Sequence, residues 1–104
     1  MVAMFLTVLG SSGSLGGPSS PASGYLVEVE GCAPVVVDMG PGVLGALQRH
    51  VSPEDVTVLL SHLHADHCLD VPGLLVWRRY GPEATGAGVV PLIGPSGTAY
   101  RIGV

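Results

Sequence analysis

The chain has 104 residues, of which 47% are hydrophobic and 12% charged, and it carries a formal net charge of −4. So high an apolar content with so few charges is typical of one packed domain and excludes a disordered chain. The four cationic residues are scattered arginines, without the basic stripe that nucleic-acid-binding proteins present, so nucleic acid is not an expected partner.

The amino-terminal stretch is apolar, but no basic residue precedes it and it is too short to cross a bilayer. We therefore expect residues 5–9 to form a first strand, and the protein to be cytoplasmic with no membrane partner. Two cysteines, Cys32 and Cys68, are too few for a disulfide framework and fit a reducing compartment. The glycine- and serine-rich stretch 10–18 then breaks the strand, as a loop that holds an anion or as a plain linker.

Two further strands are expected before the first helix. Residues 25–30 alternate apolar and acidic side chains, which predicts a strand with one wet face. Residues 34–38 contain three consecutive valines, which predicts a strand buried on both faces and ending at Asp38.

A helical region follows. Residues 43–51 predict a short helix, and His50 near its end is interpreted as a structural histidine. Residues 52–55 have the cap, first-turn proline and acidic residue of a second, one-turn helix. Residues 56–60 are apolar and β-branched, which predicts a buried strand.

Three of the four histidines crowd into one motif directly after this strand, His62-x-His64-x-Asp66-His67. On an extended segment alternate residues share a face, so His62, His64 and Asp66 can point into one cavity, which His67 joins where the chain turns. Imidazole nitrogens and carboxylate oxygens suit zinc, manganese or iron. Four donors within six residues are too crowded to surround one ion, so the motif predicts two adjacent metal ions.

Three nearby residues have expected supporting roles. Asp38 at its strand tip is expected to orient a ligand histidine by accepting the remote N–H of the ring, and the alternative is a turn cap. Cys68 is expected to pack as a small buried thiol behind the loop rather than approach the metals. Asp70 is expected to be the N-cap of the next helix rather than a ligand.

The last third of the chain predicts one helix, one strand and the start of another helix. The helix covers residues 71–80, with a proline tolerated in its first turn. Arg78 and Arg79 are interpreted as its solvated last turn, with contact to a phosphate as the alternative. Residues 89–93 predict a strand, and residues 98–104 begin a helix.

With these motifs in place, the chain resembles the metallo-β-lactamase-fold hydrolases, whose His-x-His-x-Asp-His signature closes a strand as residues 62–67 do here. Four stretches are similar to the ribonuclease Z and cyclic-nucleotide phosphodiesterase branch of that family: residues 10–14, 23–27, 37–40 and 72–74. Three more are similar to actinobacterial-type class II-like cyclic AMP phosphodiesterases: residues 45–50, 68–70 and 77–80.

The resemblance implies an α/β (α+β) fold, namely the N-terminal half of an αβ/βα sandwich, with a mixed sheet and helices on one face. Residues 1–104 are then expected to be the N-terminal part of a single domain that is truncated at its C-terminus. A third histidine for the first metal, a bridging aspartate and a further histidine for the second are expected downstream. Half a sandwich leaves an apolar sheet face uncovered.

The resemblance also implies a mechanism. His62 and His64 are expected on the first metal, Asp66 and His67 on the second, and the pair of ions activates a water molecule. Asp66 would also orient or deprotonate that water, so it is the expected catalytic residue. The expected cofactors are two divalent ions, zinc foremost, with manganese or iron as alternatives.

The expected activity is that of a hydrolase acting on a small phosphodiester, most of all a cyclic nucleotide such as cyclic AMP, with the fragment alone inactive. Ala65 and Asp70 stand where ribonuclease Z commonly has glycine, and the arm with which ribonuclease Z grips tRNA is absent from these residues. Both differences weaken the alternative hypothesis of a tRNA 3′ endonuclease. Thioester or lactone hydrolysis on the same fold stays open. So do a homodimer and a non-catalytic metal-binding half-domain.

Overall fold

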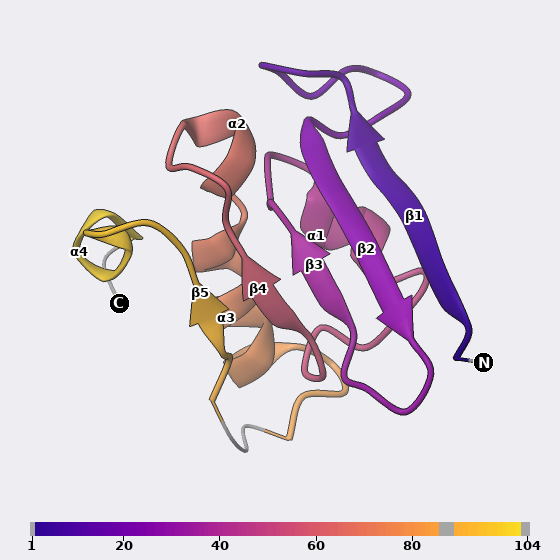
Figure 1. Ribbon diagram of the computed structural model, residues 1–104. Helices are drawn as coiled ribbons and strands as arrows, with labels where there is room; N and C mark the ends of the chain where they lie inside the picture. Colours follow the sequence, from indigo (N-terminus) through magenta and orange to yellow (C-terminus); the bar gives the residue numbers. More distant parts are fainter. Residues whose placement is uncertain (1, 86–88, 103–104) are drawn as a thin grey trace.

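The computed structural model describes residues 2–85 and 89–102, which fold into a five-stranded sheet with helices beside it (Figure 1). The strands follow one another across the sheet in chain order. They are β1 (Met4–Ser11), β2 (Ser23–Val29), β3 (Val35–Val37), β4 (Thr57–Leu59) and β5 (Leu92–Ile93). The helices are α1 (Val43–Leu47), α2 (Ala65–Cys68), α3 (Val71–Tyr80) and α4 (Thr98–Ile102).

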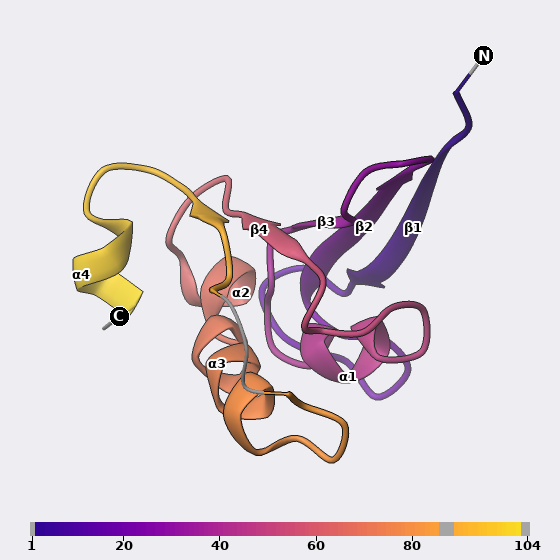
Figure 2. The ribbon, with the colours of Figure 1, turned by 90° about the horizontal axis from the view of Figure 1, so that it is seen from below.

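The sheet is mixed, because β1, β2 and β3 pair antiparallel whereas β3, β4 and β5 pair parallel. Parallel neighbours need a crossover connection, which α1 supplies between β3 and β4, and which α2 and α3 supply between β4 and β5. All three helices lie on the same side of the sheet (Figure 2). The predicted mixed sheet with helices on one face is therefore confirmed.

The hydrophobic core lies between the sheet and these helices. Leu26, Val36 and Val58 are opposite one another on adjacent strands, and all three are fully buried. Leu47 of α1 and Leu74 of α3 belong to the same buried cluster. Alternate side chains of a strand point to opposite faces, so Leu26, Val36 and Val58 all lie on the face that the helices cover.

The other face of the sheet is apolar as well. The strand register places Leu6, Val27 and Val35 in one row across it, and on β1 the residues Met4, Leu6 and Val8 are 67%, 64% and 57% exposed. The expected uncovered apolar face is thus present at β1. Among the residues described, no helix reaches the length and apolarity that crossing a membrane demands.

Two strand predictions are wrong about which face is covered. Glu28 lies on the side of the sheet that carries the buried Leu26 and is half-buried, so the acidic side of β2 is only partly solvated. Val36 is fully buried, but Val35 and Val37 are only half-buried, so β3 is not covered on both faces. Alternation in sequence separates two faces of a strand without saying which neighbour will cover each.

The predicted helices after β3 are too long. The helix predicted for residues 43–51 ends at Leu47, and the chain then turns with the backbone N–H of Val51 donating to Leu47 O at 3.1 Å, which leaves His50 exposed. Residues 52–55 form a turn rather than a helix, closed by Asp55 N donating to Ser52 O at 3.1 Å.

Other predicted elements differ mainly at their ends. The first strand runs from Met4 to Ser11, whereas β5 is limited to Leu92–Ile93 because only these residues pair with β4. The helix predicted for residues 71–80 is α3, so its bounds are confirmed. Residues 103 and 104 of the last predicted helix lie outside the described residues.

Candidate metal centre

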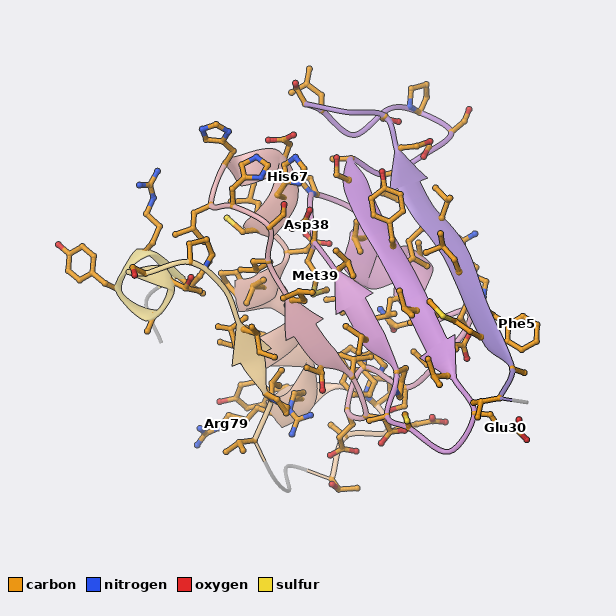
Figure 3. All side chains as sticks on the ribbon, viewed as in Figure 1. Phe5, Glu30, Asp38, Met39, His67 and Arg79 are labelled. Atoms are coloured by element: carbon orange, nitrogen blue, oxygen red, sulfur yellow. The ribbon has the colours of Figure 1, made fainter. Side chains whose placement is uncertain are left out.

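The candidate site forms where the carboxyl ends of β3 and β4 lie side by side. Asp38 directly follows β3, Ser61 and His62 follow β4, and α2 carries Asp66 and His67. Because β3 and β4 are parallel, their carboxyl ends meet at the same edge of the sheet. Figure 3 shows Asp38 and His67 next to each other at this edge.

Asp38 is the buried anchor of the site, with only 4% of its surface exposed. Its backbone has a positive φ of 62°, a conformation that aspartate tolerates better than most residues. Its Oδ1 accepts a hydrogen bond from Ser61 N at 2.8 Å, and its Oδ2 accepts one from Ser61 Oγ at 2.7 Å. The same Oδ2 lies 2.8 Å from Nδ1 of His67. Three donors thus compensate the burial of this carboxylate.

The contact with Asp38 determines which nitrogen of His67 can bind a metal. A carboxylate only accepts, so Nδ1 of His67 must donate its proton to Asp38. That leaves Nε2 with a free lone pair, yet Nε2 lies 3.0 Å from Oδ2 of Asp66. In the neutral ring, two lone pairs at this separation repel each other unless a cation, either a second ring proton or a metal ion, lies between or beside them. The Asp66–His67 pair therefore fits a bound cation.

His62 completes a close set of three donors. One donor atom from each of His62, Asp66 and His67 lies within 4.8 Å of the others. The ring centroids of His62 and His67 are 3.9 Å apart. Two imidazole nitrogens and a carboxylate oxygen are a donor set that suits zinc, manganese or iron.

His64, the fourth expected ligand, lies beside this set rather than within it. Its side chain is exposed, and its ring centroid is 4.8 Å from that of His62. The expectation of a continuous extended run through Asp66 is wrong, because His64 is the last extended residue and α2 begins at Ala65. Asp66 and His67 therefore reach His62 through a helical turn.

Gly40 holds α2 close to the strand tip, a role that the sequence analysis missed. A Cβ atom at Gly40 would lie 1.9 Å from the carbonyl oxygen of Asp66, so only glycine fits here. Two backbone hydrogen bonds accompany this close approach. Met39 N donates to His67 O at 2.7 Å, and Asp70 N donates to Met39 O at 2.9 Å. The signal that could have revealed it is the Gly-Pro-Gly run that begins two residues after the strand-tip aspartate.

Asp70 begins α3, but its carboxylate does not cap that helix, so this part of its predicted role is wrong. Its backbone is already helical (φ −85°, ψ −2°), whereas a side chain that caps its own helix requires an extended residue. Instead, Oδ2 of Asp70 accepts a hydrogen bond from Leu44 N at 2.8 Å, in the first turn of α1. The N-cap of α1 is Gly42, which has no side chain to offer.

Replacing Asp70 by alanine should therefore destabilise α1 rather than α3. We expect a loss of about 1 kcal/mol in the free energy of unfolding, as for removal of a helix cap. Urea unfolding followed by circular dichroism measures it. The matched control is Asp55→Ala, at an exposed aspartate of the turn before β4, which should change the free energy by less than about 0.5 kcal/mol. Equal losses in both variants would contradict the capping role.

Cys68 is buried behind the loop, as predicted. Its Sγ lies 3.5 Å from Leu63 O as a donor, and burial raises the pKa of the thiol, an effect that Asp38 and Asp66 reinforce and Arg101 opposes. A raised pKa leaves less of the reactive thiolate at a given pH. Burial and the raised pKa therefore lower the reactivity of the Cys68 thiol towards reagents in the solvent.

The two cysteines should therefore differ in reactivity. We expect iodoacetamide to alkylate the exposed Cys32 at least about tenfold faster than Cys68 in the folded chain, because alkylation requires an accessible thiolate. Mass spectrometry of timed digests measures both rates. In urea the two rates should converge, and comparable rates in the folded chain would contradict the burial of Cys68.

The arginine pair at the end of α3 lies away from the candidate site. Arg79 is exposed at the opposite end of the sheet from Asp38 (Figure 3), so its predicted solvated position is confirmed. Arg78 is only 8% exposed, and its Nη1 donates to Glu54 O at 2.5 Å, so the prediction of a solvated side chain is wrong for it. This hydrogen bond joins the end of α3 to the turn before β4, two segments that are distant in the sequence.

Two imidazoles and a carboxylate gathered at the carboxyl edge of a mixed sheet form a candidate metal centre of the kind that metal-dependent hydrolases use. The family model described as the Metallo-beta-lactamase superfamily matches residues 18–94, and the chain belongs to this superfamily. The predicted family is therefore confirmed.

Individual proteins are similar to this chain over almost its whole length. The uncharacterized protein Rv1339 of Mycobacterium tuberculosis is 60% identical over 103 residues, which are 99% of this chain and 37% of that protein. Ribonuclease Z of Mycobacterium avium is 34% identical over 99 residues, covering 93% of this chain and 35% of that enzyme. The chain thus spans little more than a third of the length of the relatives it matches.

A solved structure agrees with the fold. The metallo-beta-lactamase fold protein YhfI of Bacillus subtilis superposes with a TM-score of 0.82 at 30% identity, over 94% of this chain and 40% of that protein. The resemblance to the ribonuclease Z branch that the motifs predicted is therefore confirmed, and the homologues include metallo-hydrolases.

Proposed function

We propose that this chain supplies the metal-binding loop of a phosphodiester hydrolase whose substrate is a small cyclic nucleotide of the cyclic AMP type. The observation that carries the proposal is the set of His62, Asp66 and His67, whose donor atoms lie within 4.8 Å of one another beside the buried carboxylate of Asp38. The relationship to ribonuclease Z, an enzyme class that acts on phosphodiesters, favours this bond type.

Two divalent ions, zinc foremost, are the proposed cofactors, with His62 and His64 at one and Asp66 and His67 at the other. Bound there, they would supply Lewis acidity that activates water at neutral pH and neutralises charge on a phosphoryl oxygen. Asp38 accepts a hydrogen bond from Nδ1–H of His67, which leaves the lone pair of Nε2 free to bind a metal ion. In this proposal the carboxylate of Asp66, which is 21% exposed, orients the attacking water and accepts its proton.

A small substrate is favoured over a long polyanion by the charge of the chain. The net charge is −4, Arg78 is buried, and Arg79 lies at the far end of the sheet from Asp38. A tRNA would need several phosphate contacts, each from a cationic side chain or a backbone amide. The 34% sequence identity to ribonuclease Z nonetheless makes tRNA 3′ cleavage the second candidate function.

The test uses a chimera in which this chain replaces the equivalent segment of the M. tuberculosis relative, because the chain covers only 37% of that protein. With zinc or manganese, we expect the chimera to hydrolyse cyclic AMP faster than a precursor tRNA, a thioester or a lactone. Asp66→Asn should reduce cyclic AMP turnover at least about a hundredfold, as for loss of a general base.

The 104-residue chain alone should bind metal without turnover. A folded, metal-loaded chimera that hydrolyses no phosphodiester would contradict the proposal, and preference for the precursor tRNA would favour the second candidate. Metal binding by the chimera without hydrolysis of any of the four substrates would instead identify a non-catalytic half-domain.

A further inference from the structure

We propose that Ser61 is a positioning residue for His62, whose ring tautomer its hydroxyl sets so that Nε2 is the metal-binding atom. The inference rests on the proposed metal site and is independent of the substrate. The structure joins the two residues directly, because Ser61 Oγ lies 3.0 Å from Nδ1 of His62. Nothing in the sequence motif assigns a role to this serine.

The direction of the hydrogen bond follows from counting protons. A serine hydroxyl has one proton to donate, and Ser61 Oγ donates it to Oδ2 of Asp38 at 2.7 Å. Towards His62 the same oxygen can therefore offer only a lone pair. In the neutral ring Nδ1 of His62 must then carry the proton, which leaves Nε2 as the unprotonated nitrogen.

The position of the hydroxyl is itself fixed by the buried acid. Ser61 is exposed, but its backbone N–H donates to Oδ1 of Asp38 at 2.8 Å while its hydroxyl donates to Oδ2. The backbone hydrogen bond holds Ser61 beside the carboxylate, and the hydroxyl hydrogen bond orients its side chain. An exposed serine without such an anchor would rotate freely.

One carboxylate therefore orients two imidazoles of the proposed site. Asp38 Oδ2 binds Nδ1 of His67 directly at 2.8 Å, and it reaches Nδ1 of His62 through Ser61. The two rings lie with their centroids 3.9 Å apart, so both free nitrogens belong to the same small region. Residues that orient ligand histidines typically contribute 10- to 100-fold to metal affinity.

The experiment compares Ser61→Ala and Ser61→Thr with the unmodified 104-residue chain. Nitrogen-15 NMR of the metal-free protein, above the pH at which imidazoles carry charge, reports which ring nitrogen of His62 and His67 holds the proton. Competition with a chelator measures zinc affinity. The control is Ser52→Ala, which removes another serine hydroxyl that accepts a hydrogen bond, from Glu54 N at 3.2 Å.

We expect Ser61→Ala to lower zinc affinity about tenfold and to abolish the preference of His62 for the Nδ1–H tautomer, while His67 keeps its preference. Ser61→Thr retains the hydroxyl and should preserve both properties, as should Ser52→Ala. An unchanged His62 tautomer in Ser61→Ala would overturn the inference. A chain that binds no zinc would instead defeat the proposed function, and the tautomer of His62 would still decide the role of Ser61.

Discussion

Gly40→Ala is expected to displace α2 and to abolish tight metal binding. The added Cβ would lie 1.9 Å from the carbonyl oxygen of Asp66, 2.8 Å from its carbonyl carbon and 2.9 Å from Cβ of Ala22. The first two are backbone atoms of the segment that carries Asp66 and His67, so no rotation of a side chain relieves the clash. The backbone at Asp66 must therefore move by more than about 1 Å, because a Cβ atom and a carbonyl oxygen that are not bonded lie at least about 3 Å apart.

The predicted loss for Gly40→Ala is about 3 kcal/mol in the free energy of unfolding, the upper range for overpacking, with zinc affinity reduced at least about a hundredfold. Urea unfolding and chelator competition measure the two effects. Gly45→Ala is the matched control, since nothing lies within 4 Å of its added Cβ and alanine favours α1. That variant should gain about 0.5 kcal/mol. Retention of zinc affinity in Gly40→Ala would refute the close approach.

Asp38→Asn should weaken metal binding through lost hydrogen bonds rather than through backbone strain. Asparagine tolerates the positive φ of 62°, so strain does not account for any change. The amide has one accepting oxygen in place of two, whereas Ser61 and His67 together present three donors to the carboxylate. At least one donor loses its acceptor, and the negative charge beside His67 is lost.

We expect Asp38→Asn to lower zinc affinity at least about tenfold and to cost about 2 kcal/mol in the free energy of unfolding. Chelator competition and urea unfolding measure these, and nitrogen-15 NMR should show that His67 no longer favours the Nδ1–H tautomer. Asp55→Asn is the control, because Asp55 is exposed in the turn before β4. Wild-type zinc affinity in Asp38→Asn would show that the acid does not orient the ligands.

Much of the fold could be predicted from local pattern. The apolar β-branched runs locate the strands, and the proline in the first turn of α3 marks its start. The ends of elements were less predictable, since α1 ends at Leu47 and the turn at residues 52–55 replaces a predicted helix. Helix ends depend on what the next segment packs against, which local pattern does not contain.

The sequence by itself determined the kinds of donor atoms in the site, their order along the chain, and the family. Only the tertiary structure decided which donors meet. Asp38 and His67 are 29 residues apart, and they touch because β3 and β4 pair in parallel. His64, inside the motif, lies to one side because α2 begins directly after it. Contacts between distant segments depend on strand pairing and on a close backbone approach at Gly40, and a glycine in the sequence does not say which segment approaches it.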